Sequence, residues 1–303
     1  MSPDPWPEEP AARAALSAYG GGWRASLSVG MERVAERCVA ARVSHVGPLR
    51  IQKVLWPEGP SLAHLILLHP PSGLAGGDSV AFDLTLAEDC RVLLTTPGSG
   101  RWYRADAPAS QTVAVSVGAG ASLEWLPQET VLHDGVLGRS RMTIDVAAGA
   151  AALGLEVLVL GRRASGETLT RADFRSHLTL RREGRLLLAE AARVGGAERG
   201  PAALGQGHVS GLFWAVSPQP MAPELVETIE AALDEALGAD AVARDRGDGQ
   251  AIGAASLIDP HLLLVRAVGS SPERIRAALM RAWVLLRPLL IGRAAVTPRI
   301  WMT

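Results

Sequence analysis

The chain has 303 residues, of which 48% are hydrophobic and 20% charged, a composition typical of a folded globular protein. Its 30 basic and 31 acidic residues give a net charge of -1. Without excess positive charge the chain lacks the attraction that nucleic acids and anionic membranes exert, so we expect neither as a partner. Its two cysteines exclude a disulfide framework.

The N-terminal residues 1–20 predict a flexible lead, because prolines and glycines are frequent there and apolar periodicity is weak. The segment lacks the basic start and the apolar stretch of a signal peptide. The apolar runs Leu65–Leu68 and Leu262–Val265 are too short to span a bilayer. These features predict a cytoplasmic protein.

Residues 21–205 predict a body of strands arranged as a repeat. Three segments begin with a serine and then alternate apolar and polar side chains: Ser79–Leu86, Ser110–Val117 and Ser140–Val146. A turn of small residues and a second apolar strand follow each segment, at a spacing of about 30 residues. A more distant fourth copy starts at Ser176 and turns at Glu183 and Gly184.

This repeat predicts a mainly β fold whose body is stacked in two layers and resembles a β-helix. An ordinary all-β protein made of two-strand units with glycine turns would give the same pattern. The repeat therefore indicates stacked β layers under either interpretation.

Residues 206–303 predict an α+β portion packed on this β-solenoid-like body. Pro223–Leu237 is amphipathic and is followed by Gly238, a C-terminal stop. A second helix is predicted from its cap Ser271 to Arg287, where Pro288 ends it. The fold then has two α-helices, both in the C-terminal third.

The segment His69–Asp78 holds two prolines and three glycines in ten residues, which excludes a regular element. It predicts a rigid loop that presents Asp78, and with it His69, as polar groups. A purely structural loop explains the same residues. No phosphate-binding glycine motif is present in it.

Two arginines flank two aromatic residues at positions 101–104. Such a cluster suits a protein–protein interface, and it also suits an anion or a stacked base. The near-zero net charge favours the interface. We expect partner contacts from Arg101, Trp102, Tyr103 and Arg104.

Three glutamates, Glu124, Glu156 and Glu190, stand inside apolar strands, where an acid is costly unless it is paired or faces a wet cavity. Counted from the preceding turn glycine, Glu156 and Glu190 fall within one residue of the same column, together with Thr95. Stacked repeats would place these polar groups along one track. Outward alternation toward solvent explains them equally well.

Local motifs for a tight metal site or for catalysis are missing. The seven histidines are scattered, and the chain contains no H-x-x-x-H, C-x-x-C or H-E-x-x-H. It also contains no G-x-S-x-G, and neither cysteine has a base beside it in sequence. We therefore expect no enzyme, while a weak site of oxygen ligands is compatible with the sequence.

Five segments, in order, resemble the urease accessory protein UreD (UreH) family: His69–Asp78, Leu94–Arg104, Leu123–Glu129, Leu160–Glu167 and Arg287–Thr303. The family pattern reads H-P-P-G-G-x-x-G-G-D, T-x-P-G-x-x-K-F-Y-R, L-E-W-L-P-Q-E/D, L-G-R-x-x-x-G-E and a closing P-R-I-W. The resemblance covers residues 23–303. Ser72 departs from a glycine of the pattern, Ser99-Gly100 from Ala followed by Thr or Ser, and Arg101-Trp102 from Lys-Phe.

The resemblance implies a non-catalytic scaffold with a β-helix-like body and two helices. It implies that the chain binds UreF, which recruits the GTPase UreG, and that the assembly docks on the urease apoprotein. It further implies that nickel passes through the protein toward the urease active site, and that Asp78, Glu156 and Glu190 match the family acids implicated in this transfer. No tightly bound cofactor is expected, only transient nickel(II). Arg299 and Trp301 of the closing motif join the expected partner contacts.

Two other functions are compatible with these residues. A plain adaptor without a metal role would use Trp102, Tyr103 and Trp301 as anchors. A β-helix carbohydrate-active enzyme would use paired carboxylates such as Glu156 and Glu190, in an open cleft.

Overall fold

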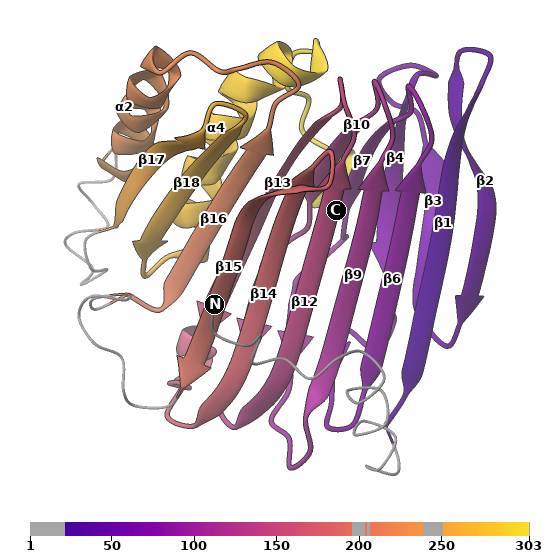
Figure 1. The fold of residues 1–303 in the computed structure, drawn as a ribbon. Helices are drawn as coiled ribbons and strands as arrows, with labels where there is room; N and C mark the ends of the chain where they lie inside the picture. Colours follow the sequence, from indigo (N-terminus) through magenta and orange to yellow (C-terminus); the bar gives the residue numbers. More distant parts are fainter. Residues whose placement is uncertain (1–21, 196–203, 205–206, 239–250, 303) are drawn as a thin grey trace.

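The structure is a computed structural model and describes residues 22–195, 204, 207–238 and 251–302. The predicted flexible lead at residues 1–20 lies outside the described residues. The described part is mainly β: two mixed sheets face each other, and two helices cover the outer side of one of them (Figure 1). None of the helices in the described residues is long and apolar enough to cross a membrane.

The first sheet has seven strands in the order β15-β14-β12-β9-β6-β1-β2. The strands are β1 (Arg24–Val34), β2 (Arg37–Val46), β6 (Ser79–Leu86), β9 (Ala109–Val117), β12 (Val136–Val146), β14 (Ala172–Arg182) and β15 (Arg185–Gly195). Its five central strands, from β14 to β1, pair in parallel, and the edge strands β15 and β2 pair antiparallel to their neighbours.

The second sheet has eleven strands, eight of them in the order β17-β18-β16-β13-β10-β7-β4-β3. These are β3 (Arg50–Leu55), β4 (Leu62–Leu68), β7 (Arg91–Thr95), β10 (Ser122–Leu126), β13 (Ala151–Leu160), β16 (Val209–Val216), β17 (Ile252–Asp259) and β18 (Leu262–Gly269). The short strands β5 (Gly73–Leu74), β8 (Gly100–Trp102) and β11 (Thr130–Leu132) extend one end of it. Because β16 pairs with β13, the sheet continues across the predicted boundary at residues 205–206.

The strands of the expected repeat alternate between the two sheets. Ser79 pairs with Ser110, but Ser140 pairs with Gln111, so the third segment is displaced by one residue. The proposed fourth copy differs, because β14 and β15 form an antiparallel hairpin within one sheet. Its turn residues Glu183 and Gly184 have φ values of 52° and 73°, the left-handed backbone that a tight two-residue hairpin needs.

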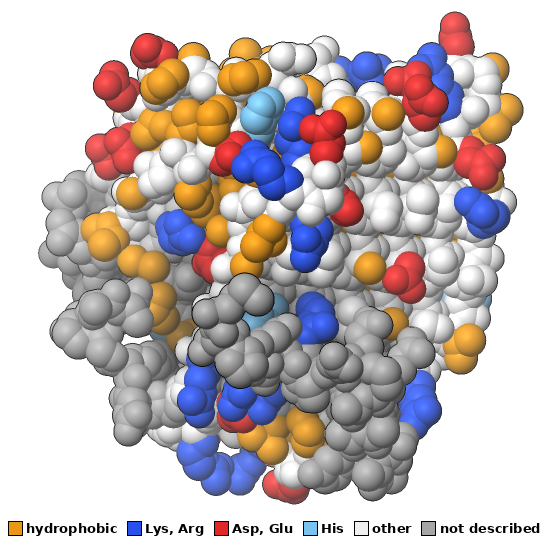
Figure 2. Space-filling view, in the orientation of Figure 1, with side chains coloured by type: hydrophobic (Ala, Val, Ile, Leu, Met, Phe, Trp, Pro, Cys, Tyr) orange, Lys and Arg blue, Asp and Glu red, His pale blue; other side chains and the backbone are white. Residues whose placement is uncertain are grey.

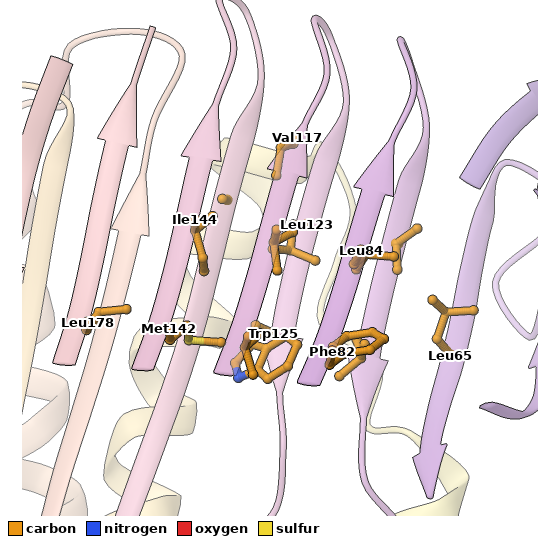
Figure 3. Packing of buried hydrophobic residues seen from close by; sticks show 14 of the residues in the cluster. Leu65, Phe82, Leu84, Val117, Leu123, Trp125, Met142, Ile144 and Leu178 are labelled. Carbon is orange, nitrogen blue, oxygen red and sulfur yellow. The ribbon is translucent and has the colours of Figure 1, made fainter. Parts of the chain in front are cut away.

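The main core lies between the two sheets. Phe82 and Leu84 of β6 point from the seven-stranded sheet toward Leu123 and Trp125 of β10 (Figure 3). The rings of Phe82 and Trp125 lie with their centroids 6.1 Å apart. Burying a side chain of this size contributes roughly 1.5–3 kcal/mol. The alternating apolar side chains of the two sheets therefore favour packing one sheet on the other.

The helices α2 (Glu224–Gly238) and α4 (Pro272–Ile291) form a third layer. They pack on the other face of the eleven-stranded sheet and create a second core. Ser271 caps α4 as predicted, because its hydroxyl accepts from the backbone N–H of Arg274 at 3.2 Å. Both predicted helices are therefore present.

The prediction that Pro288 ends the second helix is wrong, because α4 continues to Ile291. A proline removes one backbone hydrogen bond, a small loss this close to a helix end. Ile291 is 4% exposed, so burial holds the last turn. Gly292, with a φ of 72°, then closes the helix by donating its N–H to the carbonyl of Pro288 at 3.1 Å.

The surface agrees with the balanced charge of the sequence. On the face shown in Figure 2, Lys or Arg side chains lie near Asp or Glu side chains. Several pairs are in contact, including Arg139 with Asp173 at 2.6 Å and Arg185 with Asp259 at 2.9 Å. Charges arranged in this way cancel locally.

Candidate functional site

A cavity of about 470 Å³ lies between the two sheets. Phe82, Met142 and Phe174 line it from the seven-stranded sheet, and Trp125 and Leu158 line it from the other. In Figure 3, Phe82 and Met142 of the seven-stranded sheet lie beside Trp125 of the other sheet. Mostly apolar walls with a few polar groups are typical of a space that binds its occupant at a small number of points.

Three segments, each a loop that leads into one of the short strands β5, β8 and β11, form one end of the cavity. They belong to residues 69–74, 96–102 and 127–130, which include most of two motifs singled out in the sequence. Pro97, Gly98 and Arg101 line the cavity and are also exposed, so the space reaches the surface here. The predicted rigid loop therefore forms part of the mouth of an internal space.

Glu156 is the acid on the cavity wall. Ala152 of β13 lies in the core between the sheets, while Leu155 and Val157 lie under the helices. Because side chains alternate along a strand, Glu156 is on the same face as Ala152 and points toward the seven-stranded sheet. Burial, and secondarily the charge of Glu190, raises the pKa of Glu156 to about 7. Glu156 is half-buried, and within the described part of the chain no donor hydrogen-bonds its carboxyl group, so no protein group offsets the hydration that it loses.

Glu190 approaches Glu156 from the other sheet. It pairs with Leu178, a residue of the core between the sheets, so its side chain points inward from β15. Its carboxylate accepts a hydrogen bond from Arg266 of β18 at 2.5 Å. The structure thus brings two of the three predicted metal-binding acids together.

Asp78 is not part of this pair and holds a loop instead. One carboxylate oxygen accepts from the backbone N–H of Trp23 and the other from that of Ala75, both at 2.8 Å. In the same loop Ser72 has a φ of 65°, a left-handed conformation that explains why the family pattern has glycine at this position. Asp78 shapes the mouth, because residues 69–74 of its loop line the cavity.

His69 lies at this mouth, half-buried and on the cavity lining. Burial lowers the pKa of His69, and the charge of Asp78 partly opposes that change. The ring is therefore neutral at neutral pH, which is the form that can bind a metal ion. Among residues the structure describes, no three His, Cys, Asp or Glu side chains cluster tightly enough to hold an ion.

The expected partner contacts occupy different environments. Trp102 is 3% exposed and packs edge-on against Phe174 at 5.0 Å, so it belongs to the core of this chain. Tyr103 is half-buried and packs on His133. Arg101, Arg104 and Arg299 are exposed. Of the six expected partner contacts, Arg101, Arg104 and Arg299 are the ones that are exposed to a partner.

Trp301 closes the chain onto the eleven-stranded sheet. Its indole Nε1 donates to the hydroxyl of Thr95 at 2.8 Å, and the guanidinium group of Arg276 lies 4.6 Å from its ring centre. Thr95 therefore faces the helix layer, on the opposite side of the sheet from Glu156. The predicted track through Thr95, Glu156 and Glu190 is wrong for Thr95, because side chains of a strand alternate between faces.

A buried ion network was missed in the sequence. The guanidinium group of Arg287 binds Glu124 on one side and Glu58 on the other, through Nε–Oε2 and Nη2–Oε1 distances of 2.9 and 2.7 Å. Trp283 also donates to Glu124, at 2.7 Å, and His64 lies 2.9 Å from Glu58. The spacing of Trp283 and Arg287 by four residues on an apolar helix face was the available signal.

Burial raises the pKa of Glu124, and its hydrogen bonds with Arg287 and Trp283 oppose that rise. For Glu58, bonding to Arg287 and His64 outweighs burial and lowers the pKa. Burial lowers the pKa of His64. The network joins a loop, β10 and α4, so its role is to hold the helix layer on the sheet.

These features define a mainly β scaffold that encloses a cavity with an unpaired acid on its wall. The model of the family described as UreD urease accessory protein matches residues 24–302. Relatives named urease accessory protein UreD agree with this match. The one from Azoarcus sp. (strain BH72) is 42% identical over 290 residues, covering 95% of this chain and 97% of the relative.

The relative from Dechloromonas aromatica is 40% identical over 287 residues, 93% of this chain and 95% of its own length. The relative from Pseudomonas aeruginosa is 38% identical over 285 residues, which cover 93% of this chain and 95% of the relative. The chain belongs to the UreD urease accessory protein family, whose members act in urease maturation and are not catalytic. This membership overturns the alternative of a carbohydrate-active enzyme.

Proposed function

We propose that this chain is a cytoplasmic scaffold that recruits UreF, and through UreF the GTPase UreG, to the urease apoprotein, and that it passes nickel ions toward the urease active site. The observation that carries the nickel role is Glu156: a half-buried acid without a donor among the described residues, on the wall of a cavity, beside Glu190. An acid kept at this cost is expected to have a function beyond stability.

The chemistry suits an ion in transit. Nickel(II) accepts carboxylate oxygen and imidazole nitrogen, and the path offers neutral His69 at the mouth and Glu156 farther along the wall. Ligands that come one or two at a time bind weakly, and weak binding allows release. In this proposal nickel is cargo, and no cofactor is held permanently.

For Asp78 we propose an indirect part in the same path. Its two backbone hydrogen bonds fix the loop that forms the mouth, and the remaining lone pairs of its carboxylate are free for a passing cation. Asp134 supplies a matched control: it accepts from the backbone N–H groups of Thr170 and Arg171 at 2.6 and 2.8 Å, but its own loop, residues 133–135, does not line the cavity, whereas the loop of Asp78 does.

The partner surfaces follow from exposure. We propose that Arg101, Arg104 and Arg299 contact UreF or urease, and that Trp102, Tyr103 and Trp301 support these arginines from beneath. Arginine is favoured at protein interfaces because its planar group makes several directed hydrogen bonds. Replacing all three arginines by Gln should weaken pull-down of a partner while leaving thermal stability unchanged.

The test of the nickel role is urease activation in cells that express the complete set of urease accessory genes. Glu156→Gln and Glu190→Gln should lower the nickel content and activity of urease while pull-down of UreF stays at the wild-type level. Asp78→Asn should do the same, and Asp134→Asn should not. Full activation by the Glu156→Gln, Glu190→Gln double variant would leave the plain adaptor as the function.

We also propose that the parallel part of the two sheets descends from two-strand repeats of about 30 residues, stacked as in a β-helix. The support is that β6, β9 and β12 are adjacent parallel strands in one sheet and that β7, β10 and β13 are so in the other. Deleting residues 110–139 removes one such unit. The shortened chain should retain a strand-type circular dichroism spectrum and a cooperative unfolding transition.

A further inference from the structure

An ion pair joins the two sheets beside the cavity acids. Arg266 of β18 donates to Glu190 of β15 at 2.5 Å, and their side chains are 50% and 28% exposed. An ion pair at this exposure contributes little net stability, because water competes for both groups. It can therefore open without disturbing the fold.

The register of the strands places Glu156 on the inner side of this pair. Glu156 pairs with Leu212 of β16, and Leu212 pairs with Arg266 of β18, so the three form one row across the sheet. Residues in such a row share a face. Leu212 packs against the core between the sheets, which identifies this face as the one toward β15.

The two acids and the arginine thus form a small charged group at the edge of the cavity. Glu190 already has a cation beside it, whereas the half-buried Glu156 has none among the described residues. The guanidinium group contacts Oε2 of Glu190, so a divalent ion held by both carboxylates would compete with it for this carboxylate. Such an ion would gain two ligands, while the guanidinium group contacts one.

We propose that Arg266 is the resident competitor for metal at the Glu156–Glu190 pair: a divalent ion enters by displacing its guanidinium group, and the ion leaves when that group returns. The inference rests on the proposed passage of nickel. Because the Arg266 side chain is half-exposed, it turns to solvent without leaving a buried charge. Arg287, whose side chain is 0% exposed between two acids, cannot do this.

The experiment measures nickel(II) binding to the full-length chain by isothermal titration calorimetry. Arg266→Gln should bind nickel about tenfold more tightly, which corresponds to losing one competing charge at contact range. Arg266→Lys, which retains a cation, should bind within about twofold of the wild type. Arg185→Gln is the matched control, because Arg185 also joins β15 to the eleven-stranded sheet, through Asp259 at 2.9 Å.

Unchanged or weaker nickel binding by Arg266→Gln would overturn the inference, and weaker binding would make Arg266 a residue that positions Glu190. The Glu156→Gln, Glu190→Gln double variant separates this result from a failure of the proposed function. If the double variant loses nickel binding while Arg266→Gln changes nothing, only the competitor role is lost. If the double variant binds nickel as the wild type does, the passage itself is refuted. Circular dichroism of each variant confirms that it is folded.

Discussion

Glu124 and Glu156 are acids on neighbouring strands of one sheet, and they face opposite sides of it. Glu124 points to the helix layer, where Arg287 and Trp283 donate to its carboxylate. Glu156 points into the cavity, and burial together with Glu190 raises its pKa to about 7. The two acids therefore differ in exposure and in partners: Glu124 is 1% exposed and has two donors, whereas Glu156 is half-buried and has no donor among the described residues.

The strongest test of this comparison removes the donor. Arg287→Ala should lower the free energy of unfolding by about 3–5 kcal/mol, because Glu58 and Glu124 would remain buried without their cation. Urea unfolding of the full-length chain measures the change. Arg185→Gln breaks an exposed pair and should cost at most about 1 kcal/mol. A similar loss in both variants would show that the network is not what fixes the helices.

The second test concerns the pH dependence of stability. Replacing Glu156 should raise the stability of the folded chain, whereas replacing Arg287 should lower it. Its pKa is raised from 4.5 to about 7 in the folded chain, so between these values the folded state retains a proton that the unfolded state has released. The contribution of Glu156 to stability should therefore fall as pH rises through this window and stay constant above it, against the rise that His64, His69 and His133 give through their lowered pKa values. Glu156→Gln should remove the fall, which makes the variant more stable than the wild type by about 3 kcal/mol at pH 8 and equally stable at pH 4.

Thermal unfolding followed across pH 4–8 checks this expectation. Glu190→Gln should shift the fall to lower pH than in the wild type, because the charge of Glu190 contributes to the raised pKa of Glu156. Parallel stability curves for Glu156→Gln and the wild type would mean that solvent reaches this carboxyl group and that it pays no burial cost.

The smallest effect concerns Thr95, which the sequence placed in one column with Glu156. Thr95→Val removes the acceptor for Trp301 and a hydrogen bond to the carbonyl of Leu126, so stability should fall by about 1 kcal/mol. Nickel transfer to urease should stay at the wild-type level, because the side chain faces the helix layer. A Thr95→Val variant that is stable but fails in activation would return Thr95 to the proposed path.

The pattern of alternating residues was sufficient for the strands and for the general class of fold. It predicted β6, β9 and β12 and both helices, since each follows a period that burial on one side imposes. It did not single out β1, although this strand lies between β6 and β2 in the seven-stranded sheet. The hairpin of β14 and β15 was assigned to two layers, because a period of two does not reveal which sheet a strand joins.

The site could be predicted only in part, for a similar reason. An acid in an apolar strand is visible in the sequence, and Glu124, Glu156 and Glu190 were all found that way. Their partners were not, because Arg287 lies 163 residues from Glu124 and Arg266 lies 76 residues from Glu190. The different environments of the three acids depend on these distant arginines, so they could be described only once the fold was known.

The distant partners of the last helix also dictate when this protein can finish folding. Arg287 reaches back 229 residues to Glu58, and Trp301 reaches back 206 residues to Thr95. During synthesis the segments that carry Glu58, Thr95 and Glu124 emerge long before these partners, and contacts so far apart in sequence form slowly. The helix layer can therefore close over Glu124 only after Arg287 has been made, and until then water has to solvate this carboxylate.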